Sequence, residues 1–225
     1  FAGDAAHVVS PFGARGGNSG VQDVDNLVWK LDLVLRGKAP ARLLDTYSQE
    51  RVPAAHENIR HSTRSTDFIT PKNEASRTLR DAVLSLAPRH AFARALINSG
   101  RLSQASRYGA NELATADGEN WSGGAMPGCP APDAPWGNRW LFDGTDGGFR
   151  LLAFDVPIQS LPDLQTIAIE GGKDRAEVLW RRYDARPGTV YLLRPDRHVA
   201  ARWRRYDAAA VREALRRATA AQEAA

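Results

Sequence analysis

The stretch that decides the fold is FAGDAAHVVSPFGARGGNSGVQDVDNLVWKL, residues 1–31. Phe1 and Ala2 suit the last residues of a strand, so the Asp4 carboxylate is expected at a strand's carboxyl edge, where α/β proteins bind ligands. The segment from Pro11 to Gly20 is rich in glycine, which lets a backbone approach a flat ligand closely. Together these features predict a site with an acidic group for hydroxyls beside a glycine loop.

Beyond this loop, apolar residues recur at the three- and four-residue spacing of one helical face. They are Val21, Val24, Leu27, Val28, Leu31, Val34 and Leu35. The spacing predicts a helix from about Asn18 to Arg36, with Asn18 and Ser19 as N-cap residues and Gly37 as the stop. The start of this helix would aim its N–H groups and its positive dipole end at an anion or an electron-rich oxygen held in the loop.

The ordered string resembles the GD motif of the FAD-dependent, single-component aromatic-ring hydroxylases. The resemblance covers about the first 36 residues: Gly-Asp-Ala-Ala-His at 3–7, the glycine loop, and an Asp-x-x-Asn-Leu-x-x-Lys-Leu helix from Asp23. Two departures stand out. Ser10 occupies a position where many relatives have a second proline, and Ala14-Arg15 replaces a glycine-rich pair. We expect Arg15 to face solvent rather than the flavin or the nicotinamide donor.

The resemblance implies roles for individual residues. Asp4 would accept hydrogen bonds from the ribityl chain of FAD, Gly3 would let the backbone pass the cofactor, and Pro11 would lie beside the reactive edge of the flavin. The loop residues that would present N–H groups to the pyrimidine end of the isoalloxazine are Gly13, Gly16, Gly17 and Asn18. His7 is interpreted as a structural donor, and no catalytic residue is predicted.

The rest of the first half is predicted to be helical up to about Tyr108. Residues 40–70 are expected to form one long helix that Pro53 kinks or breaks, and residues 73–100 two helices divided at Pro88. Residues 109–138, rich in Gly, Pro, Ala and Asn, are expected to form a linker or an ordered long loop. The chain is therefore divided into residues 1–125, the helical remainder of an FAD-binding domain, and residues 126–225.

The second domain is predicted to be a small α/β domain. RWLFDG and FRLLAFDV (139–144 and 149–156) are expected to form a hairpin around DGTDGG, followed by a strand in 164–172 and a helix in 174–185. Residues 188–204 are expected to give two strands joined by RPDR, and residues 208–222 a final helix. This half resembles the thioredoxin-like domain of phenol-type and 3-hydroxyphenylpropionate-type hydroxylases. A redox thioredoxin needs a cysteine pair, and Cys129 is the single cysteine, so the domain is expected to be a structural or dimerising appendage.

Composition excludes several classes of protein. The 225 residues are 43% hydrophobic and 25% charged, with no apolar run near the ~20 residues of a membrane helix, so a cytoplasmic protein is expected. The net charge of +4 does not predict nucleic-acid binding, because Asp and Glu are interspersed among the arginines. The five histidines show no metal-cluster spacing, so no metal is predicted.

The Gly-x-Gly-x-x-Gly turn that holds the ADP half of FAD is absent from the sequence, so we expect the chain to be the C-terminal part of a longer hydroxylase. The resemblance implies that NAD(P)H reduces FAD and that oxygen is then transferred to a phenolic substrate bound with the remainder of the FAD and substrate domains. The alternative is a complete, non-catalytic interaction module that reuses the loop to hold a partner. A non-flavin nucleotide binder ranks last, because the loop lacks the Lys-Ser/Thr ending of a P-loop.

Overall fold

The computed structural model describes residues 1–11, 15–97, 106–109, 111–144, 147–159, 161–162, 164–171 and 177–221. They fall into two compact units. The first unit is Phe1–Asp25 with Arg51–Ala105, and the second is Asn26–Glu50 with Ser106–Ala225. The domain boundary expected between residues 125 and 126 stays a prediction.

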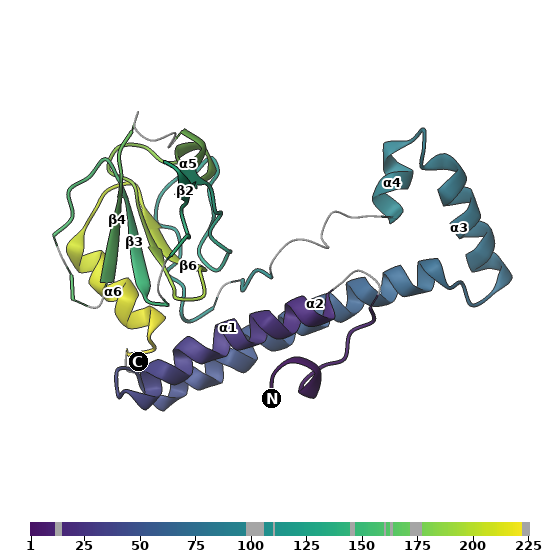
Figure 1. Ribbon diagram of the computed structural model, residues 1–225, viewed down its shortest axis with the longest axis horizontal. Helices are drawn as coiled ribbons and strands as arrows, with labels where there is room; N and C mark the ends of the chain where they lie inside the picture. The colour runs from purple at the N-terminus through teal and green to yellow at the C-terminus, as the bar shows by residue number, and fades with distance from the viewer. Residues whose placement is uncertain are drawn as a thin grey trace. The chain divides into compact units, whose positions relative to one another are not determined.

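Helices make up the first part of the chain, as the sequence predicts (Figure 1). They are the 3₁₀ helices η1 (Gly3–Ala5) and η2 (Ala41–Leu44) and the α-helices α1 (Gly16–Leu35), α2 (Asp45–Ile69), α3 (Glu74–Leu86) and α4 (Ala91–Ile97). The division between α3 and α4 at Pro88 is confirmed. Of the two effects expected at Pro53, a break is wrong, because α2 continues through that residue as a helix, and a kink stays a prediction.

Helix α1 starts earlier than predicted and ends where predicted. It begins at Gly16, so Asn18 and Ser19 lie inside its first turn instead of capping it. Its end forms a Schellman motif: Gly37 has φ +67°, and the N–H groups of Gly37 and Lys38 bond to the carbonyls of Val34 and Leu33. Glycine is favoured there because the left-handed conformation carries no Cβ penalty.

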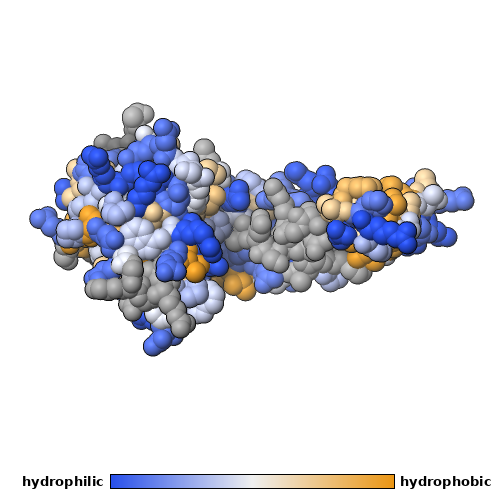
Figure 2. All heavy atoms as spheres, turned by 90° about the horizontal axis from the view of Figure 1, so that it is seen from above, coloured by the Kyte–Doolittle hydropathy of each residue, from blue (hydrophilic) through white to orange (hydrophobic). Residues whose placement is uncertain are grey.

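Helix α1 buries polar side chains and exposes much of its apolar face. Asp23, Asn26 and Lys30 are at most 1% exposed, whereas Val21 is 69% and Val28 55% exposed. Helices α3 and α4 also carry exposed apolar side chains, and Figure 2 shows apolar surface over this part of the chain. The residues are Leu79, Leu84, Leu86, Phe92, Leu96 and Ile97. No helix among the described residues is both long and apolar enough to cross a membrane.

The second unit is built on a four-stranded sheet with strand order β4-β3-β5-β6. Its elements are β3 (Phe149–Phe154), β4 (Leu164–Ile169), α5 (Glu177–Arg182), β5 (Val190–Leu193), β6 (Val199–Trp203) and α6 (Ala208–Ala218). Strand β3 pairs parallel with β4 and antiparallel with β5, and β5 and β6 form the predicted hairpin. This arrangement is compatible with a thioredoxin-like domain.

The hairpin predicted between residues 139–144 and 149–156 is wrong. Strand β2 (Arg139–Trp140) pairs with β1 (Pro135–Trp136), across a two-residue turn at Gly137 and Asn138. Gly137 has φ +62°, the left-handed conformation that tight hairpin turns require.

The period-two alternation of strand β3 separates the core into two layers. Leu151 and Ala153 pack in a cluster that contains Val211 and Ala214 of α6. Leu152 and Phe154 pack in a second cluster that contains Leu179 of α5. The sheet is therefore covered by α6 on one face and by α5 on the other (Figure 1).

The described residues before β1 in the segment 109–138 form an ordered loop, one of the two predicted alternatives. Its backbone bonds along β6 and the turn before it: Thr115 N–H donates to Ala200, Gly128 N–H to Val199 and Ala131 N–H to Arg197. These bonds satisfy backbone groups that a buried loop would otherwise leave unpaired.

Candidate cofactor site

The residues expected to hold the ribityl chain form a compact turn. Gly3 has φ +61°, and its carbonyl accepts hydrogen bonds from the N–H groups of Ala6 (2.8 Å) and His7 (3.0 Å). The Asp4 side chain is exposed, and no group among the described residues bonds to its carboxylate. The turn therefore presents an acidic side chain to its surroundings.

The turn packs closely on α1. A Cβ at Gly20 would lie 3.3 Å from the Gly3 Cα, so both positions favour glycine at this contact. Gly20 is one turn along from the start of α1 at Gly16. The Asp4 turn and the first part of α1 are therefore neighbours within the first unit.

The start of α1 forms the second part of the predicted site. The first hydrogen bond described in this helix runs from the Ser19 N–H to the Arg15 carbonyl (2.8 Å). An α-helix leaves its first N–H groups without intrahelical partners and carries the positive end of its dipole there. Gly17 and Asn18 are exposed, and a Cβ at Gly17 would meet no atom within 4 Å. Among the described residues, the backbone at Gly17 is therefore accessible to a ring or an oxygen.

A buried carboxylate, Asp23, ties the turn to both helices. It is 1% exposed and accepts hydrogen bonds from the Gly3 N–H (2.9 Å), the His7 Nε2 (2.7 Å) and the Arg51 Nε (2.7 Å). Burial alone would raise the pKa of Asp23, but the bonds from Gly3, Arg51 and His7 outweigh it and hold the pKa below its ordinary value. Because an ionised carboxylate only accepts hydrogen bonds, His7 Nε2 carries the proton.

We expected Arg15 to face solvent, and this prediction is wrong. It is 6% exposed, and its Nη1 donates to the Asn58 Oδ1 of α2. Asn58 also donates to the Ser19 hydroxyl (3.2 Å). The segment before the loop is anchored to α2 as well, because the Ser10 hydroxyl lies 2.8 Å from the Thr66 hydroxyl.

The predicted cofactor residues thus lie on two neighbouring elements. Gly3 and Asp4 lie in the turn, Gly16, Gly17 and Asn18 lie at the start of α1, and Pro11 is exposed between the two elements. Gly13 lies outside the described residues. The roles assigned to these residues toward FAD stay predictions.

The polar residues that support this arrangement, above all Asp23 and Arg51, were not predicted from the sequence. The available signal was a polar stripe on α1, since Asp23, Asn26 and Lys30 follow each other at three- and four-residue spacing. Glu50 and Arg51 of α2 are both 3% exposed and pair with Lys30 and Asp23 of α1, so these ion pairs join helices instead of lying at the surface.

A second buried polar cluster lies in the second unit. Glu50 accepts bonds from Lys30 Nζ (2.8 Å), Asn26 Nδ2 (2.7 Å) and Arg194 Nη2 (3.0 Å), and Arg194 also pairs with Asp196. Burial lowers the pKa of Lys30 to about 8, although the negative charge of Glu50 acts to raise it. Burial alone would raise the pKa of Glu50 and of Asp196, but Arg194 holds both below their ordinary values. The cluster joins α1, α2 and the turn between β5 and β6.

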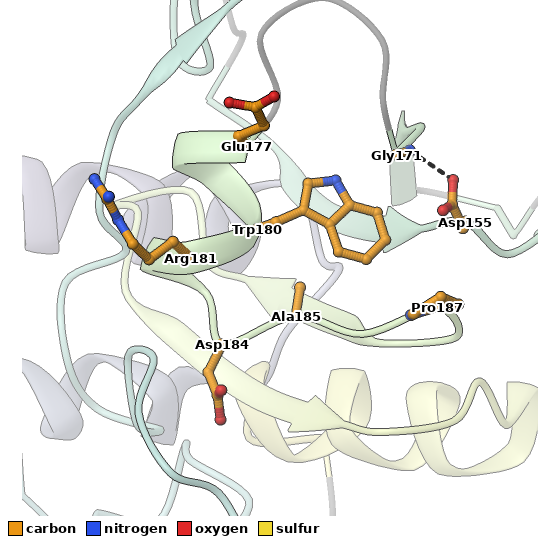
Figure 3. Close-up of a pocket in the computed structure, with 8 residues that line it drawn as sticks. All are labelled: Asp155, Gly171, Glu177, Trp180, Arg181, Asp184, Ala185 and Pro187. Carbon is orange, nitrogen blue, oxygen red and sulfur yellow. Dashed lines mark hydrogen bonds between the residues drawn. The ribbon is translucent and has the colours of Figure 1, made fainter.

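A pocket of about 560 Å³ lies in the second unit beside α5 (Figure 3). Its lining residues are Asp155, Gly171, Glu177, Trp180, Arg181, Asp184, Ala185 and Pro187. The Trp180 ring extends from α5 toward Asp155, whose Oδ1 accepts a bond from the Gly171 N–H (2.8 Å). None of the predicted cofactor residues lines this pocket, and its carboxylates form no metal-binding group among the described residues.

Comparison with known proteins supports the cofactor interpretation of the first part of the chain. The family model described as "FAD binding domain" matches residues 1–62. Tetracenomycin A2 monooxygenase-dioxygenase of Streptomyces glaucescens is 50% identical over 89 residues, which cover 37% of this chain and 15% of that protein. The 3-(3-hydroxy-phenyl)propionate/3-hydroxycinnamic acid hydroxylase of Comamonas testosteroni is 41% identical over 84 residues, which cover 37% of this chain and 14% of that protein. The chain thus matches a small part of the length of these relatives.

Solved structures resemble nearly the whole chain. RebC-10x, native and bound to K252c, has a TM-score of 0.72 and 25% identity, covering 98% of this chain and 45% of that one. The flavin-dependent monooxygenase PieE, in complex with FAD and substrate, has a TM-score of 0.76, and the match covers 97% of this chain and 47% of that one. Because the two sequences are 24% identical, this match shows the fold alone. These matches confirm the predicted α/β fold class and the resemblance to FAD-dependent aromatic hydroxylases.

Proposed function

We propose that this chain is the part of an FAD-dependent aromatic monooxygenase that holds the ribityl chain and the isoalloxazine ring of the flavin. The observation that carries the proposal is the exposed Asp4 carboxylate on a turn that packs against α1 at Gly20. The match of residues 1–62 to an FAD binding domain supports it.

The residues present fit the chemistry of FAD. The Asp4 carboxylate has no bonding partner among the described residues, so its oxygens are available to ribityl hydroxyls. The first turn of α1, which contains Gly16, Gly17 and Asn18, would direct the positive end of the helix dipole toward an electron-rich ring. When bound, FAD would supply the redox chemistry that activates oxygen for transfer to the substrate. The role of this chain would be to position the cofactor.

The substrate class and the partners follow from the relatives. Their names describe oxygenation of tetracenomycin and of hydroxyphenyl acids, which supports a phenolic substrate and gives no support to a non-catalytic interaction module. We infer that NAD(P)H is the co-substrate and that the remaining parts of the FAD and substrate domains complete the site. The C-terminal α/β part would be a structural or dimerising appendage, since its single cysteine provides no redox pair.

The test is flavin binding by the full-length gene product. The wild-type protein is expected to purify with FAD and to couple NAD(P)H oxidation to hydroxylation of a phenol. Asp4→Ala is expected to weaken FAD binding by about tenfold or more, the contribution of a hydrogen bond to a charged group. Asp32→Asn is the control, because Asp32 is exposed on α1 and pairs only with Arg36 in the described contacts. A wild-type protein without flavin affinity would refute the proposal.

A further inference from the structure

One carboxylate oxygen holds both ends of the Asp4 turn. Asp23 Oδ2 accepts the Gly3 N–H at 2.9 Å and lies 2.7 Å from His7 Nε2. Gly3 and His7 flank Asp4 in the chain, and the His7 N–H also bonds to the Gly3 carbonyl at 3.0 Å. The backbone that carries Asp4 is therefore held at both its entry and its exit by a single side chain from α1.

Each described group that bonds to the Asp23 carboxylate donates the hydrogen bond. The other oxygen, Oδ1, accepts from the Arg51 Nε of α2 at 2.7 Å, and both side chains are at most 3% exposed. An amide at position 23 would have the same shape but would turn an NH₂ group toward these donors. The arrangement therefore requires an ionised carboxylate.

A steric contact acts on the same turn independently. Gly3 adopts φ +61°, and the added Cβ of an alanine at Gly20 would lie 3.3 Å from the Gly3 Cα. Contacts of that length are tighter than ordinary van der Waals contact, so the turn would have to move away from α1. The orientation of the turn thus depends on a hydrogen-bond anchor and on a close backbone approach.

From this geometry we propose that Asp23 is a positioning residue that fixes the Gly3–His7 backbone on α1 and thereby places the Asp4 carboxylate for the ribityl hydroxyls of FAD. The inference rests on the proposed function. Asp4 is exposed and unbonded among the described residues, so only its backbone sets its position. Asp23 is buried under the turn, which separates its role from direct contact with the cofactor.

A double-mutant cycle on the full-length protein tests the proposal. The dissociation constant of FAD is measured by flavin fluorescence on folded apoprotein for the wild type, Asp4→Ala, Asp23→Asn and the double variant. Asp23→Asn is expected to raise the constant by about tenfold, as for the loss of a charge-assisted hydrogen bond. In the Asp4→Ala background the same change is expected to raise it by less than about twofold, because Asp23 acts through Asp4.

Backbone hydrogen exchange gives a readout that needs no cofactor. The Gly3 N–H of the apoprotein is expected to be protected in the wild type and to exchange faster in Asp23→Asn. If Asp23→Asn does not fold, Gly20→Ala takes its place in the cycle, because it displaces the same turn without removing a charge. His7→Gln, which keeps a donor for Asp23, is expected to bind FAD more tightly than His7→Ala.

The outcomes separate the two proposals. Asp32→Asn, the same substitution at an exposed site of α1, is expected to bind FAD like the wild type. If the wild type binds FAD and the effects of Asp4→Ala and Asp23→Asn simply add, or if Asp23→Asn leaves the affinity unchanged, the positioning role is wrong while the proposed function stands. If the wild type does not bind FAD, both are wrong.

Discussion

Replacing Glu50 by Gln is expected to destabilise the protein by about 3–5 kcal/mol, the range for removing one partner from a buried ion pair. Glu50 is 3% exposed and accepts bonds from Arg194, Lys30 and Asn26. The cluster balances two cations, Lys30 and Arg194, against two anions, Glu50 and Asp196. The change to Gln leaves one buried positive charge uncompensated, and the loss is a large share of the 5–15 kcal/mol that stabilises a typical domain.

The assay is urea unfolding at neutral pH followed by tryptophan fluorescence. Trp29 is a local probe, because the Arg194 Cζ lies 5.2 Å from its ring centroid. The matched control is Glu213→Gln, which removes an exposed partner of Arg216 on α6. Its effect is expected to stay within about 0.5 kcal/mol, as for other exposed ion pairs.

The result that would refute this reasoning is a Glu50→Gln variant no less stable than Glu213→Gln. A second comparison separates charge from shape. Glu50→Gln combined with Lys30→Met restores neutrality, so the double variant is expected to lose less free energy of unfolding than the sum of the two single losses. A loss equal to that sum would show that packing, not charge balance, determines the cost.

Four further predictions concern pH, packing, backbone conformation and cofactor affinity. The pKa values of Asp23, Glu50 and Asp196 lie below their ordinary values of 3.8 for Asp and 4.5 for Glu. The stability that these ionised carboxylates contribute is therefore present above the ordinary values and is lost as the pH falls below them. Urea titrations between pH 7 and pH 3 should show the free energy of unfolding decreasing, and its decrease with pH should be shallower in Glu50→Gln. Leu192 lies in the centre of the sheet and is fully buried, so Leu192→Ala should lower the free energy of unfolding by about 2–5 kcal/mol in the same assay. An unchanged urea midpoint would contradict the placement of Leu192 in the core. Gly128→Ala should lower the free energy of unfolding by about 1–3 kcal/mol, because Gly128 has φ +82° and a Cβ would lie 2.8 Å from the Gly109 carbonyl oxygen. The control Gly118→Ala should have little effect, because a Cβ there would meet no atom within 4 Å. The 225-residue chain alone should bind FAD weakly, because no Gly-x-Gly-x-x-Gly turn is present in it for the ADP half; flavin copurifying at full occupancy would contradict this.

The elements with strong local signals could be predicted from the sequence. Gly37 ends α1 because only a residue that tolerates positive φ completes the Schellman motif there. The strands in 190–193 and 199–203 follow from apolar runs on either side of a turn. The hairpin predicted around DGTDGG is wrong, because strand β2 pairs instead with β1 across the two-residue turn Gly137-Asn138. Glycine and asparagine are residues that such tight hairpin turns favour.

The burial of charged residues could not be predicted in the same way. Periodicity shows which residues share a face of α1, but it does not show which face is buried. The Lys30 ammonium is buried because it donates to Glu50 and Asn26, and the other cation on Glu50, Arg194, lies 144 positions away. Arg15 was misjudged for the same reason, since its partner Asn58 lies on another helix. Such compensation between distant residues becomes visible only in three dimensions.

The buried cluster has a consequence for the order of folding. Arg150 and Gln165, which face each other across β3 and β4, are 15 positions apart, so this part of the sheet can form early. Glu50 and Arg194 must instead close a loop of 144 positions. Lys30, 20 positions from Glu50, pairs with it, and Asp196, two positions from Arg194, pairs with that residue, so each of these pairs closes a much shorter loop. We therefore expect the late docking step to join two electrically neutral pairs, which lowers the cost of removing these four ions from water.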